Sequence, residues 1–111
     1  MSTLSTHVLD TAKGRPAEGL AIVLEVQEHA AFRELARGTT NADGRVKDFV
    51  QGQVLPPGIY RLSFDTGAYF ESQGTKGFYP EVSVLFELGP ESHYHVPLLL
   101  SPFGFSTYRG S

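Results

Sequence analysis

Residues 20–28, Leu20-Ala21-Ile22-Val23-Leu24-Glu25-Val26-Gln27-Glu28, decide the fold of this chain. Ile22, Leu24 and Val26 recur at every second position, so in an extended strand their side chains share one face. Alternation of this kind predicts a β-strand whose apolar face is buried and whose other face is turned away from the core.

The same alternation recurs along the chain, separated by turn-forming glycines, prolines and asparagines. We expect further strands over residues 4–10, 32–40, 46–50, 59–66, 81–88, 92–100 and 103–109. One short helix is predicted over residues 68–76, ended by Gly74 and Gly77. About eight short strands with 12 glycines and 7 prolines among the turns predict an all-β sandwich or barrel.

Composition limits the function. A chain of 111 residues predicts one domain, residues 1–111. Cysteine is absent, which excludes disulfides, thiolate metal sites and a cysteine nucleophile. A net charge of −3 without a basic run predicts no nucleic-acid partner. The sequence has no secretory signal and no apolar run of the ~20 residues that span a bilayer, so we expect no membrane partner and a cytoplasmic location.

Three histidines are candidates for chemistry. His93 and His95 are two residues apart on one expected strand, so both side chains point to the same face. Such a pair can bind zinc, with His7 as a third ligand and water as the fourth. The strand carries no carboxylate beside them, which favours a reading without metal. His29 follows a strand next to Glu28 and is expected to be solvated.

The end of the chain, Tyr108-Arg109-Gly110-Ser111, follows directly after the last expected strand. Chain ends usually fray, so one interpretation is a short tail. The other is an end that docks and contributes contacts. Composition does not decide between these two interpretations.

Arg45 follows the Asp43-Gly44 turn, and taken alone it is an ordinary loop arginine.

Four segments together resemble the 5-hydroxyisourate hydrolases, the enzyme branch of the transthyretin-like proteins. They occur in the family's order and span nearly the whole chain. They are Leu4-Ser5-Thr6-His7-Val8-Leu9-Asp10 with Gly14, Pro16 and Ala17; Thr40-Asn41-Ala42-Asp43-Gly44-Arg45; Phe78-Tyr79-Pro80-Glu81; and His93-Tyr94-His95-Val96-Pro97-Leu98 through Ser101-Pro102 to Tyr108-Arg109-Gly110-Ser111.

This resemblance implies a transthyretin-like (prealbumin-like) sandwich of two four-stranded antiparallel sheets with one short helix. It implies a homotetramer, a dimer of dimers, with sites at the dimer–dimer interface. His7, Arg45 and His95 correspond to the family's catalytic residues, and no cofactor or metal is implied. Substrate binding is implied for His7, Arg45 and the end of the chain, Tyr108, Arg109, Gly110 and Ser111. His93 flanks this set and is not one of the family's core catalytic residues.

The implied reaction belongs to urate degradation in purine metabolism. It hydrolyses 5-hydroxyisourate to 2-oxo-4-hydroxy-4-carboxy-5-ureidoimidazoline by opening a ring amide. Such a step needs an activated water, a stabilised oxyanion and a proton for the leaving nitrogen. We expect His95 or His7 to act as the general base and Arg45 to stabilise the oxyanion.

Three alternatives remain open on the sequence. A transthyretin-like protein that binds a small ligand without chemistry shares the fold, but it looks different at the histidine and arginine positions and at the chain end. A zinc hydrolase would use His7, His93 and His95. A structural sandwich without chemistry leaves the four matching segments unexplained.

Overall fold

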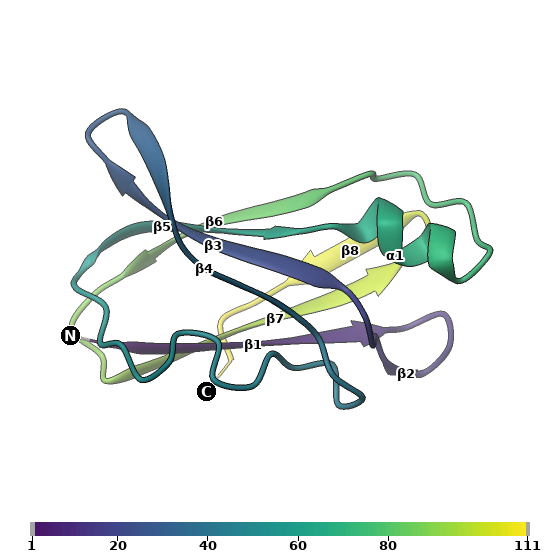
Figure 1. Cartoon of the computed structure of the whole chain (residues 1–111), viewed down its shortest axis with the longest axis horizontal. Coiled ribbons are helices and arrows are strands. Elements are labelled where there is room, and N and C mark those ends of the chain that lie inside the picture. The colour runs from purple at the N-terminus through teal and green to yellow at the C-terminus, as the bar shows by residue number, and fades with distance from the viewer. Residues whose placement is uncertain (1, 111) are drawn as a thin grey trace.

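The computed structural model describes residues 2–110 of the chain. In that range it contains eight strands and one helix (Figure 1). In chain order they are β1 (Thr3–Asp10), β2 (Arg15–Pro16), β3 (Ala21–Glu28), β4 (Ala31–Thr39), β5 (Gly58–Phe64), α1 (Thr66–Ser72), β6 (Val82–Leu88), β7 (His93–Ser101) and β8 (Gly104–Thr107).

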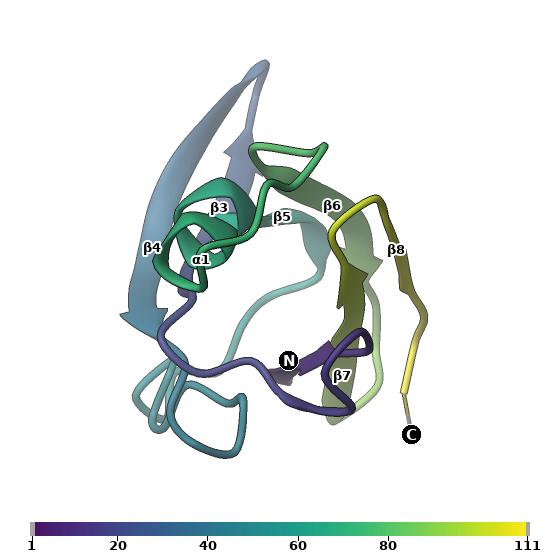
Figure 2. The same ribbon diagram turned by 90° about the vertical axis from the view of Figure 1, so that its right-hand side faces the viewer.

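The strands form two four-stranded sheets that face each other, as the end-on view in Figure 2 shows. One sheet has the order β2-β1-β7-β8 and the other the order β4-β3-β5-β6. The expected sandwich of two four-stranded sheets with one short helix is confirmed. Its strand pairs are antiparallel except β1–β7, which is parallel and which the sequence did not predict.

The core follows from the period-two alternation of the strands. Ile22 and Leu24 of β3 are fully buried, as are Leu62 and Phe64 of the neighbouring β5. In β1 the even-numbered residues are buried and the odd-numbered ones are partly exposed. Full burial of one such apolar side chain stabilises the fold by about 1.5–3 kcal/mol. The residues that the alternation of the sequence assigns to the inner faces therefore hold the two sheets together.

Two predicted elements need correction. Residues 46–50 form turns, not a strand, because Asp48 and Gln51 have positive φ values of 53° and 49° that break an extended backbone. Phe49 and Val50 in this segment are nevertheless buried. The eighth strand is instead β2, a two-residue strand that pairs with the end of β1.

The helix begins earlier than predicted, at Thr66, because the Asp65 side chain accepts a hydrogen bond from the Ala68 amide. It ends before Gly74, whose φ of 69° lies in the left-handed region. The Tyr69 hydroxyl donates to Oδ2 of the buried Asp10 at 2.7 Å. This bond ties the helix to the end of β1.

The connection between β4 and β5 runs along the open edge of β1. Near its start, the Val8 amide donates to the carbonyl of Gly44 at 2.9 Å. Near its end, Ser2 and Leu55 exchange two backbone hydrogen bonds. In Figure 2 this connection and the tail that follows β8 lie on opposite sides of the β1–β7 pair. Two remote parts of the chain therefore flank β1 and β7.

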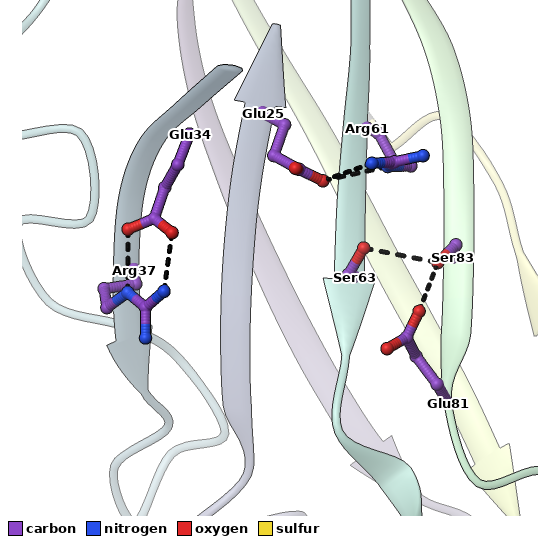
Figure 3. Close-up of polar contacts among 7 residues, drawn as sticks. All are labelled: Glu25, Glu34, Arg37, Arg61, Ser63, Glu81 and Ser83. Carbon is purple, nitrogen blue, oxygen red and sulfur yellow. Dashed lines mark hydrogen bonds and ion pairs between the residues drawn. The ribbon is translucent and has the colours of Figure 1, made fainter. Parts of the chain in front are cut away.

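The outer face of the other sheet carries polar side chains across four strands (Figure 3). Arg61 of β5 pairs with Glu25 of β3 at 2.8 Å, and its Cζ lies 3.8 Å from the centre of the Phe32 ring. Ser63 and Ser83 are joined by a hydrogen bond of 3.2 Å. Among residues 2–110 there is no helix long and apolar enough to cross a membrane.

Candidate active site

The three candidate histidines gather on the outer face of β1 and β7. Because these strands are parallel, the register places Ser5 beside His95, Thr3 beside His93, and His7 beside Pro97. Side chains alternate between the faces of a sheet. The odd-numbered residues of both strands therefore project away from the core, and the predicted His7 and His95 lie on one surface together with His93.

Two hydroxyl groups of β1 bind the histidines of β7. The Ser5 Oγ lies 2.7 Å from Nδ1 of His95 and 3.2 Å from Nε2 of His93. The Thr3 Oγ1 lies 2.6 Å from Nδ1 of His93. Hydrogen bonds within residues 2–110 thus engage three of these four ring nitrogens. The fourth, Nε2 of His95, makes no hydrogen bond to residues 2–110.

The surroundings of His95 favour its neutral form. Burial lowers the pKa of His95 below its usual 6.5, and the positive charges of Arg45, His7 and His93 lower it further. The Ser5 backbone opposes this shift. Because a neutral imidazole has one unprotonated nitrogen, His95 can accept a proton near neutral pH.

Arg45 is held next to the histidines by a tight turn built on Asn41. The Asn41 side-chain oxygen accepts hydrogen bonds from the amides of Asp43, at 2.9 Å, and Arg45, at 3.1 Å. The Asn41 amide donates to the Arg45 carbonyl at 2.8 Å. The Arg45 side chain is exposed, so its guanidinium is available to a ligand above the sheet.

A glycine packs against each of the two histidine rings. Gly44 has a φ of 75°, and a Cβ there would lie 2.4 Å from the Val8 carbonyl oxygen and 3.2 Å from Cδ2 of His7. A Cβ on Gly110 would lie 2.7 Å from Cδ2 of His95. Only glycine fits both places without displacing a neighbour.

The end of the chain is docked. The Gly110 amide donates to the carbonyl of His95 at 2.7 Å, and the two residues form an isolated β-bridge. Of the two interpretations that the sequence left open, the docked end is therefore the one found. Ser111, predicted to bind substrate, lies outside the described residues.

Tyr108 and Arg109 have a different environment from Gly110. The Arg109 Cζ lies 4.7 Å from the centre of the ring of Tyr94, which is buried and points to the side of β7 opposite His95. Tyr108 and Arg109 line a groove of about 300 Å³ together with residues of β6. Within one chain, these two side chains sit at the edge of the sandwich, whereas Gly110 forms a bridge with His95.

The structure also places His29 and His93. His29 is exposed after the end of β3, as expected for a solvated residue. Residues 2–110 contain no group of three histidine or carboxylate side chains placed to hold a metal ion. His93 shares the face with His95 but binds Thr3 and Ser5 through its two ring nitrogens.

Sequence reasoning missed two residues that shape this site. Ser5 lies inside a segment that the resemblance highlights, but its role depends on the parallel register that sets it opposite His95. Asn41 was noticed only as a turn former, whereas its side chain fixes the backbone of Arg45. The Asn-x-x-Gly spacing of the turn is a signal that could have found it.

Taken together, the outer face of β1 and β7 combines an imidazole nitrogen that makes no hydrogen bond within residues 2–110, a second histidine and a permanent cation. A neutral imidazole can take a proton from water, and a guanidinium can stabilise a developing oxyanion. The arrangement suits a hydrolysis in which water attacks a carbonyl carbon.

A family model described as Transthyretin: HIUase/Transthyretin family matches residues 4–110. The 5-hydroxyisourate hydrolase of Salmonella dublin is 47% identical over 109 residues, which cover 97% of this chain and 80% of that protein.

Two solved structures are similar along almost their full length. A Klebsiella pneumoniae 5-hydroxyisourate hydrolase is 42% identical with a TM-score of 0.90, and the match covers 100% of both chains. Sea bream transthyretin in complex with thyroxine is 35% identical with a TM-score of 0.91, covering 96% of this chain and 93% of that one. The fold alone therefore matches a 5-hydroxyisourate hydrolase and a thyroxine-bound transthyretin equally well.

Proposed function

The chain belongs to the HIUase/transthyretin family and is a hydrolase, and on this premise we propose that it hydrolyses 5-hydroxyisourate in urate catabolism. The observation that carries the proposal is the meeting of His7, Arg45 and His95 on the outer face of β1 and β7. The product is the ureidoimidazoline carboxylate, and the reaction needs no cofactor.

His95 is the general base in this proposal. Its Nδ1 is held by the Ser5 hydroxyl, so Nε2 is the nitrogen that can take a proton from the attacking water. The lowered pKa of His95 keeps the ring neutral at physiological pH. His7 binds the substrate and orients the water from the neighbouring strand.

Arg45 binds the substrate carbonyl and stabilises the oxyanion that forms as water adds. A guanidinium offers fixed, permanently charged donors for this purpose. Cleavage of the ring C–N bond then returns the proton from His95 to the leaving nitrogen. Ionisation of the new carboxylic acid releases one proton, which balances the reaction.

The end of the chain contributes to substrate binding and to the position of His95. Gly110 packs against His95, and Arg109 stacks on Tyr94, which supports a role for Arg109 in positioning the tail as well as in binding the substrate. Tyr108 offers a hydroxyl donor to the ring carbonyls of the substrate. Ser111 is assigned a substrate contact on the resemblance alone.

We also propose that four copies of the chain assemble as a dimer of dimers, with the sites at the dimer–dimer interface. The edge strands β6 and β8 lie on the same side of the sandwich (Figure 2), with the groove lined by Tyr108 and Arg109 between them. Leu85 of β6 has 62% of its surface exposed. An apolar edge of this kind suits self-association. Sedimentation at equilibrium tests it, and a monomer at micromolar concentration contradicts it.

The activity is tested by following the absorbance of freshly made 5-hydroxyisourate with and without the protein. We expect faster decay with the protein, and no acceleration with His95→Gln or with a chain that lacks residues 108–111. A truncated chain with the full rate contradicts the assignment. Decay that stops on chelation would favour the zinc hydrolase.

The alternative is a protein that binds a small ligand without chemistry, favoured only by the similarity to sea bream transthyretin. Thyroxine binding without any turnover of 5-hydroxyisourate would support that alternative.

For location we propose the cytoplasm, in keeping with a chain that has no cysteine to form disulfides. Fractionation of the source cells tests this location.

A further inference from the structure

Ser5 and His93 form a chain of hydrogen bonds that starts at His95 and ends at the exposed side of the site. The links are His95 Nδ1 to Ser5 Oγ at 2.7 Å and Ser5 Oγ to His93 Nε2 at 3.2 Å. A third link joins His93 Nδ1 to Thr3 Oγ1 at 2.6 Å. We propose that Ser5 and His93 are positioning residues that take over, as a proton relay, the charge that His95 gains during hydrolysis.

The direction of each bond follows from what His95 must do, so the inference rests on the proposed function. A general base at Nε2 carries its proton on Nδ1, and this N–H donates to the Ser5 oxygen. The Ser5 hydroxyl then donates to Nε2 of His93, and Nδ1–H of His93 donates to Thr3. Each donor along this series of hydrogen bonds therefore faces an acceptor.

The relay balances in both halves of the reaction. When water attacks, His95 accepts a proton at Nε2 and passes its Nδ1 proton to Ser5, and Ser5 passes its own proton to His93. When the C–N bond breaks, His95 gives its Nε2 proton to the leaving nitrogen. The other two protons then return along the same path. All three residues end as they began, and the positive charge rests on His93 between the two steps.

The charges around His95 favour this transfer. Arg45, from the turn after β4, and His7, from β1, both disfavour an imidazolium at His95. His93 is exposed in the single chain whereas His95 is partly buried, so a cation is better solvated at His93. As an imidazolium, His93 would keep a hydroxyl acceptor at each nitrogen, Thr3 at Nδ1 and Ser5 at Nε2. Within residues 2–110 the Ser5 side chain makes hydrogen bonds to these two histidines and to no other group.

Four variants of the full chain separate proton transfer from simple packing. Ser5→Ala removes the relay hydroxyl, and Ser5→Thr keeps it. His93→Gln keeps a side chain that can bond to Ser5 but cannot take up a proton. Thr11→Ala is the matched control, because Thr11 also joins the β1 end to β7, through a hydrogen bond to the Leu100 carbonyl at 3.1 Å.

We expect Ser5→Ala and His93→Gln to lower kcat by about tenfold or more, as loss of proton-transfer assistance does, while KM changes by less than about twofold. Ser5→Thr should retain most of kcat, and Thr11→Ala all of it. A His93→Gln variant with the full kcat overturns the relay, even if Ser5→Ala is slow, because Ser5 would then only orient His95.

A second measurement does not depend on turnover. Nitrogen-15 chemical shifts of the histidine rings should place the proton of neutral His95 on Nδ1 in the unmodified protein. Ser5→Ala should make the two tautomers comparable. A proton found on Nε2 overturns the relay. Absence of turnover in the unmodified protein would instead overturn the proposed function, so the two failures are distinguishable.

Discussion

The backbone amide of Gly110 and the carbonyl of His95 are joined by a hydrogen bond of 2.7 Å, which brings the tail against the imidazole ring. A methyl group on Gly110 would lie 2.7 Å from Cδ2 of His95. Gly110 therefore helps to fix the orientation of the His95 ring, the proposed general base.

Gly110→Ala should disturb catalysis more than folding. The new methyl group must push either the His95 ring or the tail aside, and a displacement of about 1 Å at a reacting group costs about a hundredfold in rate. We expect a loss of kcat of that order in the 5-hydroxyisourate assay. Gly104→Ala is the control, because a Cβ there meets only Ser101 Oγ, at 3.7 Å. Equal rates for the two variants would contradict this role of Gly110.

Gly44→Ala should destabilise the fold as well as the site. Its φ of 75° is strained for alanine, and its Cβ would lie 2.4 Å from the Val8 carbonyl oxygen. We expect the free energy of unfolding to fall by about 2–3 kcal/mol in urea titrations. Gly14→Ala has a similar φ of 67° but open space around its Cβ, so it should cost only about 1 kcal/mol. Equal losses would show that the contact with Val8 does not matter.

Removal of the charge of Arg45 should raise the pKa of His95. Burial is the main cause of the lowered pKa and Arg45 is the next. In Arg45→Gln we therefore expect His95, followed by its ring signals in NMR, to become protonated at a higher pH than in the unmodified protein. The residual activity should also begin to fall at a higher pH on acidification.

Arg33→Gln is the matched control for this titration, since it removes the same charge from an exposed ion pair with Glu28. The titration of His95 should not change in this variant. If both variants move it equally, the effect comes from net charge and not from the proximity of Arg45.

On the opposite sheet, Arg61→Ala should reduce stability and leave kcat unchanged. The variant loses a partly buried ion pair with Glu25 and the stacking of the guanidinium on Phe32. We expect the free energy of unfolding to fall by about 1 kcal/mol. Arg37→Ala breaks the more exposed pair with Glu34 (Figure 3) and should produce no measurable change. A fall in kcat for Arg61→Ala would contradict the placement of the site on the β1–β7 face.

The strands were predictable wherever one face is buried. The alternation in residues 20–28 reports burial of Ile22 and Leu24 directly, and β3 begins within one residue of the prediction. The strand predicted over residues 46–50 was wrong because the apolar Phe49 and Val50 are buried in a turn and not in a strand. β2 has only two residues, too few to show any periodicity.

The sequence identified candidate residues of the site, but it did not predict how their side chains are arranged. The resemblance named His7, Arg45 and His95, and their proximity agrees with it, although their catalytic roles stay predictions. The contact of Ser5 with both His93 and His95 could not be predicted, because it depends on which strand pairs with β1 and in which direction. Non-local pairing of that kind leaves no local pattern in the sequence.

The parallel pairing of β1 with β7 also fixes the order in which the protein can mature. Ser5 and His95 are 90 positions apart, so a ribosome has released the first strand long before its partner exists. Until then β1 has an unpaired edge in a nascent chain, and closing so long a loop slows folding. A chain that ends before His95 lacks the proposed general base, so we expect it to show no hydrolysis. The proposed site is complete only after β7 has paired with β1 and Gly110 has bonded to His95.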